Sequence, residues 1–438
     1  MKRYVMTSIL LLLTLSLLVF LTLRDDGADK GQQSPDGVTG IEDEGSGVIP
    51  PAEAPPAVND GEEVSDIVPS TPPPEPVPPE QDAEALLMAV GDIMMHMPQL
   101  PGSYDAQAKR YDFTPMFSSV KPILQEADWA MANLEAPLSA DGDYTGFPMF
   151  NAPHELAAAL KDAGFTIVTN SNNHSLDRGA KGVERTLKFL HLQGLLTKGT
   201  ATSEEQAAEP LLVERGGITL GVLAYTYGTN GIPVPEGKPY LVDLMDEERM
   251  VRDIHALRED GADYIAVALH FGTEYQTQPN EEQKRIARRL IAEGADLIAG
   301  SHPHVIQPYE TVEAANLDGS IRHGVILYSM GNFISNQRGD TKDYGIIYRI
   351  HLRRPAGSAT VQAVDVEPIV TWVHRYKEKG RYQYRILPVE QTLKDRNNPL
   401  LTAADYKALE NNFHILQKRL STMLQPSADN AAQPSNDG

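Results

Sequence analysis

The chain has 438 residues and no cysteine. Disulfide bridges and lipid attachment at a cysteine are therefore both excluded. A basic stripe is also lacking, because 60 acids outnumber 38 lysines and arginines and the formal net charge is −22. Nucleic acid is consequently not an expected partner. Neither an internal repeat nor a glycine-rich phosphate loop is present, which argues against a repeat protein and a P-loop nucleotide site.

A long apolar run extends from Val5 to Leu23, after Lys2 and Arg3. As a helix it comes close to the hydrocarbon thickness of a bilayer, roughly 30 Å. The run is long for a signal peptide, and no small-residue cleavage site follows it. Bases before the run and acids after it place the N-terminus inside the cell. We predict that residues 1–23 form an uncleaved transmembrane signal anchor, with the remaining chain outside the cytoplasm; a cleaved secretion signal is the alternative.

Residues 24–84 contain sixteen acids and two bases, and eleven prolines lie between Pro50 and Pro79. So few apolar side chains cannot offset the entropy of ordering, and proline favours extended geometry. We expect a disordered acidic linker that holds a domain away from the membrane. Residues 425–438 are expected to form a disordered tail.

Between residues 85 and 390, short apolar runs alternate with helical patterns, which predicts an α/β domain. Buried strands are expected over 85–90, 129–133, 165–170, 264–269, 296–300 and 324–330. Helices are expected over 179–194, 246–261 and 280–295, each with apolar residues three or four positions apart. We also expect a hairpin turning at Gly216-Gly217, strands over 344–354 and 359–370, and a C-terminal helical segment over 391–424.

Oxygen- or nitrogen-bearing side chains follow five of the predicted strands directly. Asp92 and His96 follow the first, Glu135 the second, Asn173 and His174 the third, His270, Glu274 and Tyr275 the fourth, and His302 and His304 the fifth. In a mainly parallel sheet these carboxyl ends share one edge, where α/β proteins place ligands. We therefore expect the side chains to converge.

Pro303 separates the two histidines of the last group and excludes helix there, so both rings should project to one side. Rings about 6 to 7 Å apart could serve two neighbouring metals. The alternative is an ordinary loop pair bonded to nearby carbonyls. A mixed oxygen and nitrogen set suits Mn²⁺, Fe²⁺ or Zn²⁺ rather than Ca²⁺. One carboxylate could bridge two ions, while a further imidazole protonates a leaving group.

The ordered motifs VGDIMMH, NLEAPLS, NSNNHSLDRG, HFGTEYQ, GSHPHVIQ and SMGNFISNQ lie between Leu87 and Gln337. This set resembles the CapA family of poly-gamma-glutamate capsule synthesis proteins, itself similar to calcineurin-like metallophosphoesterases. The resemblance implies a four-layer sandwich in which helices flank two mixed sheets.

The resemblance also implies roles for individual residues. Asp92 and His304 would bind a first metal, Asn173, His270 and His302 a second, Glu135 would bridge them, and His174 would be the catalytic general acid. Two positions depart from the phosphoesterase pattern, because Met94 stands where a histidine is usual and Glu135 replaces a shorter aspartate. One or two ions are therefore expected.

Four further residues are candidates for substrate binding: Arg178, Glu274, Tyr275 and Asn332. Arg178 could bind an anionic group. Glu274 and Tyr275 could instead lie on the surface, Asn332 could belong to a turn, and Asp177 could cap the helix that begins near Gly179.

The resulting expectation is a membrane-anchored, extracytoplasmic capsule biosynthesis protein with a metal-dependent hydrolase domain acting on a phosphoester or related bond. The alternative is a non-catalytic subunit of a membrane polyglutamate synthase or export complex. An acidic domain is a poor electrostatic match for polyglutamate unless a metal or local arginines offset the repulsion.

Overall fold

The computed structural model describes residues 81–315 and 321–424. The predicted anchor, the linker up to residue 80 and the predicted tail lie outside the described residues. Within these two ranges, no helix has both the length and the apolar character required to cross a bilayer.

The larger sheet is mixed and has the order β18-β17-β16-β1-β4-β7-β8, with β15 paired to β1. Its strands are β1 (Ala83–Ile93), β4 (Trp129–Leu134), β7 (Ile167–Thr169), β8 (Leu196–Lys198), β15 (Asn332–Ile334), β16 (Tyr344–Arg354), β17 (Gln362–Glu378) and β18 (Arg381–Pro388). Strands β1, β4, β7 and β8 run parallel, whereas β16, β17 and β18 form an antiparallel extension on the other side of β1.

The smaller sheet has the order β13-β14-β12-β11-β10-β9. Its strands are β9 (Leu211–Arg215), β10 (Ile218–Thr226), β11 (Tyr264–His270), β12 (Leu297–Ser301), β13 (Tyr309–Ala315) and β14 (Ile321–Leu327). The central four are parallel and the two edge strands antiparallel. The predicted hairpin is confirmed: Gly216 and Gly217 have φ angles of 58° and 75°, which the turn requires and glycine adopts at little cost.

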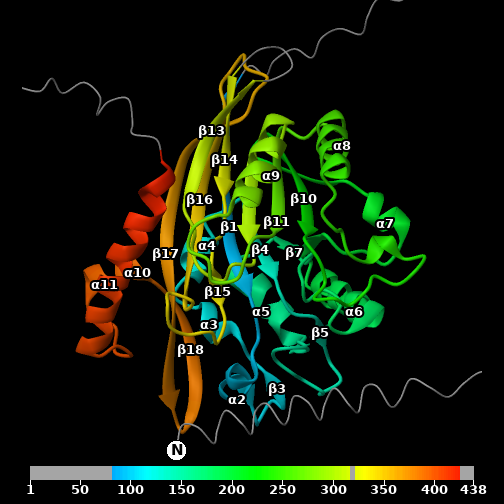
Figure 1. Cartoon of the computed structure of the whole chain (residues 1–438). Helices are drawn as coiled ribbons and strands as arrows, with labels where there is room; N and C mark the ends of the chain where they lie inside the picture. The colour runs from blue at the N-terminus through cyan, green and yellow to red at the C-terminus, as the bar shows by residue number, and fades with distance from the viewer. Residues whose placement is uncertain (1–80, 316–320, 425–438) are drawn as a thin grey trace, which may run out of the picture. The chain divides into compact units, whose positions relative to one another are not determined.

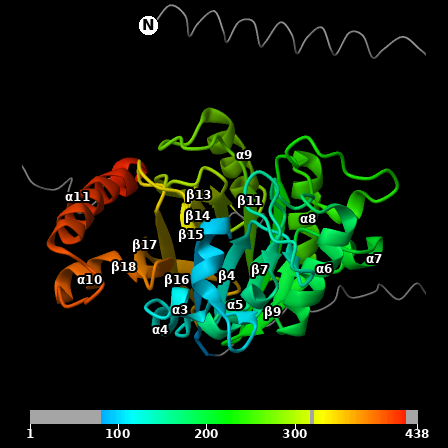
Figure 2. The same cartoon turned by 90° about the horizontal axis from the view of Figure 1, so that it is seen from below.

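The two sheets share one core, and helices cover their outer faces. Along β1, Leu87 and Ala89 face the core between the sheets, whereas Met88 and Val90 face a second core under helices. Both faces of the strand are therefore buried, which explains its continuous apolar sequence. The predicted four-layer sandwich is confirmed (Figures 1 and 2).

The helices divide between the sheets. The helices on the side of the larger sheet are α2 (Leu100–Ser103), α3 (Thr114–Phe117), α4 (Lys121–Leu124), α5 (Glu155–Ala163) and α6 (Gly179–Leu192). Two short strand pairs lie between these helices in the chain. One consists of β2 (Tyr104–Asp105) and β3 (Arg110–Tyr111), and the other of β5 (Leu138–Ser139) and β6 (Ala152–Pro153). The smaller sheet is covered by α8 (Glu247–Glu259) and α9 (Glu281–Ala292), preceded by α7 (Glu204–Ala208). Helices α10 (Val389–Asp395) and α11 (Ala403–Leu420) cover the inner face of the antiparallel extension.

Two features of the fold differ from the sequence prediction. The strand predicted over 359–370 continues as β17 to Glu378 and forms a hairpin with β18, which was not predicted. These residues alternate polar side chains with tyrosines, so no apolar run marks them. The ligand-bearing strands also belong to two sheets rather than one, since β1, β4 and β7 lie in one and β11 and β12 in the other.

Candidate metal centre

Asp92 lies at the carboxyl end of β1, and its carboxylate contacts residues carried by strands of both sheets. Its Oδ1 accepts a hydrogen bond from Nδ2 of Asn133 at 2.8 Å. Its Oδ2 lies 3.0 Å from Nδ1 of His304 and 3.3 Å from the backbone nitrogen of His302. The structure therefore brings together residues more than 200 positions apart, at an edge formed by both sheets.

Glycines permit this approach of the strands. A Cβ atom on Gly91 would stand 1.9 Å from the carbonyl oxygen of Gly331, and one on Gly300 would stand 2.1 Å from that of Tyr328. Only a residue without a side chain fits where backbones pass so closely.

The histidine pair has the projection expected from the sequence, but through a less common backbone. His302 and His304 have φ angles of 99° and 58°, in the left-handed region. Their ring centroids are 6.0 Å apart, and each offers a nitrogen near Glu135. Non-glycine residues in this region cost about 1–3 kcal/mol and concentrate at functional sites. Tyr275, also left-handed, donates its N–H to the Pro303 carbonyl at 2.8 Å and braces the loop.

Glu135 is fully buried, and neither of its carboxylate oxygens has a hydrogen-bond partner among the described residues. Its Oε1 lies 3.6 Å from Nε2 of His270 and 3.7 Å from Nε2 of His304. Burial and the nearby Asp92 raise the pKa of Glu135 well above its usual value. A buried carboxylate without donors is costly unless a cation compensates it, so the residues present fit a divalent metal.

The nitrogen atoms of His270 are fixed on both sides. Nδ1 lies 2.9 Å from the hydroxyl of Ser301, and Nε2 lies 3.0 Å from Oδ1 of Asn173. Burial, with the neighbouring His302 and His304, holds the pKa of His270 well below its usual value. A neutral, oriented imidazole is the form in which histidine binds metals.

His174 is held by a second carboxylate. Its Nδ1 lies 2.7 Å from Oδ2 of Asp177, which also accepts the backbone N–H of Phe150 at 2.7 Å. The Phe150 ring packs edge-on against the imidazole, with 4.7 Å between centroids. Asp177 therefore orients His174 instead of capping α6, whose N-cap residue Arg178 makes no side-chain cap.

Arg178, a candidate for substrate binding, is engaged elsewhere. Its Nε donates to the Phe150 carbonyl at 3.1 Å, and its Nη2 donates to the Met149 carbonyl at 2.9 Å and to the hydroxyl of Thr145. These contacts hold the loop that carries Phe150 against His174. Arg178 therefore acts on the site indirectly, through the Phe150 loop, and does not point its donors at the metal ligands.

The three other candidates occupy different surroundings. Asn332 is buried and donates to the His304 carbonyl at 3.3 Å and the Lys342 carbonyl at 2.8 Å, so it supports the histidine loop. Tyr275 is 46% exposed, with its ring centroid 6.1 Å from that of His304. Glu274 is exposed in the same loop.

Met94 and His96, the two residues at the first departure from the phosphoesterase pattern, lie in different surroundings. Met94 is buried in the core under the helices. His96 lies close to the centre, with its ring 5.2 Å from that of Phe150, but its Nδ1 faces the backbone nitrogen of Asn336 at 3.4 Å. Burial, assisted by His304, lowers the pKa of His96 to about 4. Neither belongs to the clusters of possible metal ligands in the described part of the chain.

Two residues of the site were missed from the sequence. Tyr227, half exposed, packs its ring 4.7 Å from that of His302 and 6.3 Å from that of His270. Asn230 accepts from Nδ2 of Asn173 at 3.2 Å, and its own Nδ2 lies 3.5 Å from Nδ1 of His174. Both follow β10, a buried strand, so their position was a usable signal, although no charged or imidazole side chain marked it.

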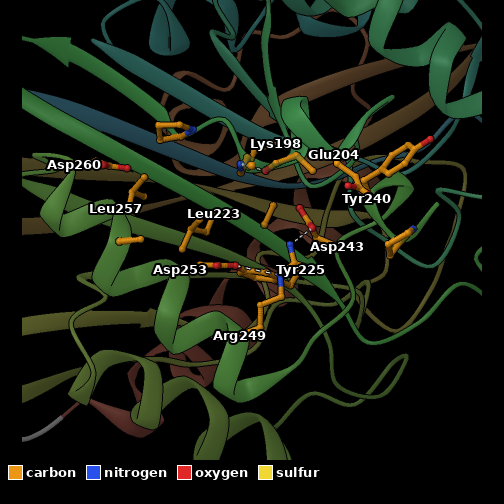
Figure 3. A pocket seen from close by; sticks show the side chains of 16 residues that line it. Lys198, Glu204, Leu223, Tyr225, Tyr240, Asp243, Arg249, Asp253, Leu257 and Asp260 are labelled. Atoms are coloured by element: carbon orange, nitrogen blue, oxygen red, sulfur yellow. Dashed lines mark hydrogen bonds and ion pairs between the residues drawn. The ribbon is translucent and has the colours of Figure 1, made fainter. Parts of the chain in front are cut away.

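A separate cavity of about 360 Å³ lies between β10, α7 and α8 (Figure 3). Several of its polar side chains are paired with one another: Arg249 bonds Asp243, and Tyr225 donates to Asp253 at 2.7 Å. None of the predicted metal ligands lines it. The candidate metal centre and this cavity are therefore two separate places in the structure.

The chain is similar to known proteins in sequence and in fold. The chain is 28% identical over 284 residues to the PGA biosynthesis protein CapA of Bacillus subtilis, covering 63% of this chain and 70% of that protein. Among solved structures, it is similar to the calcineurin-like phosphoesterase YfkN of B. subtilis, with 15% identity and a TM-score of 0.39, covering 66% of this chain and 90% of that one. It is also similar to the NAD nucleotidase NadN of Haemophilus influenzae, with 13% identity and a TM-score of 0.41; the alignment covers 78% of this chain and 61% of that one.

A family profile accounts for the whole site region. It spans residues 86–337, from the first residues of β1 past the histidine loop and Asn332, and describes the bacterial capsule synthesis protein PGA_cap. This span covers more than half of the chain and includes each of the predicted metal ligands. The chain therefore belongs to the PGA_cap family of bacterial capsule synthesis proteins.

Proposed function

We propose that this protein is a membrane-anchored, extracytoplasmic hydrolase of poly-gamma-glutamate capsule biosynthesis, and that it cleaves a phosphoester or related bond in the polymer or its carrier. One observation carries the hydrolytic part: the carboxylate of Glu135 is fully buried, has no donor among residues 81–315 and 321–424, and lies between two imidazoles. The family supports the capsule role, and the apolar run Val5 to Leu23 supports the anchor.

Mn²⁺, Fe²⁺ or Zn²⁺, as one or two ions, would be held by Asp92, Glu135, Asn173, His270, His302 and His304. A divalent metal bound there supplies Lewis-acid stabilisation of negative charge on the scissile group. The burial of the ligand side chains strengthens each electrostatic contact. The attacking oxygen of the hydrolysis is that of a water molecule, which replaces the leaving oxygen on the scissile group.

His174 is assigned the proton transfer. Asp177 occupies Nδ1, so Nε2 is the ring nitrogen through which a proton can pass to a leaving oxygen. The Phe150 ring keeps the imidazole from rotating, and Arg178 holds the Phe150 loop in place. Tyr227 covers His302 from the exposed side and is available to contact substrate.

The test uses the full chain, purified in mild detergent and loaded with Mn²⁺, with a phosphodiester whose leaving group is an alkyl alcohol that must be protonated to depart. We compare the parent with His174→Ala and His302→Ala, and use His255→Ala, an exposed histidine of α8, as the matched control. Hydrolysis is expected to fall in the first two variants and persist in the control. Equal turnover in all four proteins would eliminate the hydrolytic mechanism.

The alternative of a non-catalytic subunit of a polyglutamate synthase complex has one observation in its favour. Met94 lies in the core where the phosphoesterase pattern has a ligand, so the site has one histidine fewer. The double variant His174→Ala with His302→Ala is expressed in a host from which its own gene for this protein has been deleted. Capsule formation and protein level then distinguish the subunit role from the catalytic role. Normal capsule with normal protein levels supports the subunit role, and loss of capsule supports catalysis.

A further inference from the structure

The hairpin of β17 and β18 is the basic part of an acidic chain. Within its sequence HRYKEKGRYQYR, residues 374–385, five bases stand beside a single acid, whereas the whole chain has a net charge of −22. A concentration of one sign against the background charge marks a surface that attracts the opposite charge.

Two of the five bases, Arg375 and Lys377, share one face of the hairpin with Tyr382 and Tyr384, whereas Arg381 and Arg385 alternate to the other face. Arg375 stands over the ring of Tyr382 with its guanidinium carbon 4.7 Å from the centroid, and Lys377 stands over the same ring at 5.2 Å. Arg338 stands over Tyr384 at 5.5 Å. Arg375, Lys377 and Tyr382 are exposed. Such contacts position the charged heads while leaving their donors free for an anion.

Arg338 lies half-buried at the inner end of this face. Its Nη1 donates to the Val373 carbonyl at 2.6 Å and lies 3.7 Å from the carboxylate of Asp343. Its Nε and Nη2 atoms are buried and have no acceptor within the described ranges, so this guanidinium adds positive charge beneath the exposed cations without itself contacting a ligand on the surface.

The basic face is connected to the metal centre. Asn336 accepts from the hydroxyl of Tyr384 at 2.6 Å and from Arg375 at 3.2 Å, and its backbone nitrogen faces His96 at 3.4 Å. His96 in turn packs on Phe150, which contacts His174. A chain of direct contacts therefore runs from the exposed hairpin to the proposed general acid.

We propose that the exposed face formed by Arg375, Lys377 and Tyr382 binds a linear polymer bearing one carboxylate per unit and directs it to the metal centre. Successive same-face residues of a strand lie about 6.5–7 Å apart, so the two cations are spaced along the strand and do not form a single pocket. Such spacing suits a polymer better than a small anion. The Tyr382 ring offers an apolar surface to the methylene groups between carboxylates.

This inference rests on the proposed function for the identity of the polymer, poly-gamma-glutamate. It also resolves an electrostatic difficulty, because an acidic protein otherwise repels a polyanion. The hairpin supplies the local arginines that such binding requires.

The experiment measures binding of fluorescein-labelled poly-gamma-glutamate to the full chain by anisotropy, in EDTA and detergent, so that neither metal nor turnover contributes. The double variant Arg375→Gln with Lys377→Gln is compared with Lys394→Gln with Lys407→Gln, two exposed lysines on α10 and α11. The hairpin variant is expected to raise Kd at least tenfold and to weaken the salt dependence, while the control changes it less than twofold.

Double-stranded DNA and anionic lipid vesicles serve as comparison ligands, and both are expected to bind at least tenfold more weakly than the polymer. Equal loss in both double variants, or tighter binding of DNA or vesicles, would overturn the proposal. Retained hydrolysis with no polymer binding would refute the hairpin role alone. Polymer binding that depends on the hairpin, in a protein without hydrolysis, would refute the catalytic proposal alone.

Discussion

The Nδ1 atom of His174 lies 2.7 Å from Oδ2 of Asp177, and both side chains are almost completely buried. A buried carboxylate bonded to one nitrogen of an imidazole fixes the orientation of the ring. The pair has the geometry of an oriented proton donor.

We predict that Asp177→Asn lowers kcat on the order of 10²-fold for a phosphodiester with an alkyl leaving group, since that group needs a proton. With a nitrophenolate leaving group, which departs unprotonated, the loss should be much smaller. Steady-state kinetics on the two substrates measure the difference. Asp162→Asn, at an exposed ion pair with Lys121, is the control. An equal loss on both substrates would indicate a purely structural role for Asp177.

Glu135 should make the stability of the metal-free protein depend on pH. Burial raises its pKa above the ordinary value in the folded state, so its contribution is fully present at acidic pH and is lost as the pH rises towards the raised pKa. We expect metal-free parent protein to lose Tm, relative to Glu135→Gln, as the pH is raised from about 5 to about 8. The difference between the two thermal curves reports Glu135, because other groups titrate in both. A constant difference across this range would contradict the prediction.

Ser301 should tune metal affinity through His270. Removing its hydroxyl with Ser301→Ala leaves Nδ1 without its partner at 2.9 Å, and loss of such a contact typically weakens binding about 10–100-fold. Titration of Mn²⁺ into stripped protein measures the change. In the parent, Mn²⁺ at about 100 times its Kd should raise the unfolding free energy by about 2.7 kcal/mol. Ser118→Ala, at an exposed residue directly after α3, should bind Mn²⁺ as the parent does.

Gly300 should tolerate no side chain. The added methyl of Gly300→Ala would stand 2.1 Å from the Tyr328 carbonyl oxygen, which backbone atoms cannot relieve cheaply. We expect a loss of about 3 kcal/mol or more in unfolding free energy, together with weaker metal binding through the displaced His302. Gly228→Ala, where nothing lies within 4 Å of the new atom, should change stability by less than about 0.5 kcal/mol. Denaturant unfolding of both variants provides the comparison.

Much of the site could be predicted because one local rule applies along the whole chain: a buried strand ends and a ligand-bearing side chain follows. Asp92, Glu135, His270 and His302 all obey it. Tyr227 also follows a buried strand but was not identified, since no charged or imidazole group stands there. Its importance arises from packing on His302, which no local pattern encodes.

The partner of a long polar side chain could not be predicted. Arg178 was a reasonable anion ligand from its place after the Asn-His pair, yet its donors bond the backbone of Phe150 and Met149, about 30 positions earlier. The β17–β18 hairpin was missed for a related reason. A strand with polar side chains on its exposed face lacks the apolar run that identifies a buried strand.

By itself the sequence determined the class of fold and the kinds of ligand, because apolar periodicity and the chemistry following each strand are properties of neighbouring residues. Only the tertiary structure decided how those ligands group, with Glu135 between His270 and His304 and Asp177 behind His174. The physical reason is distance along the chain: contacts such as that of Asp92 with His304 join segments 212 positions apart, and they exist only once two sheets have packed together.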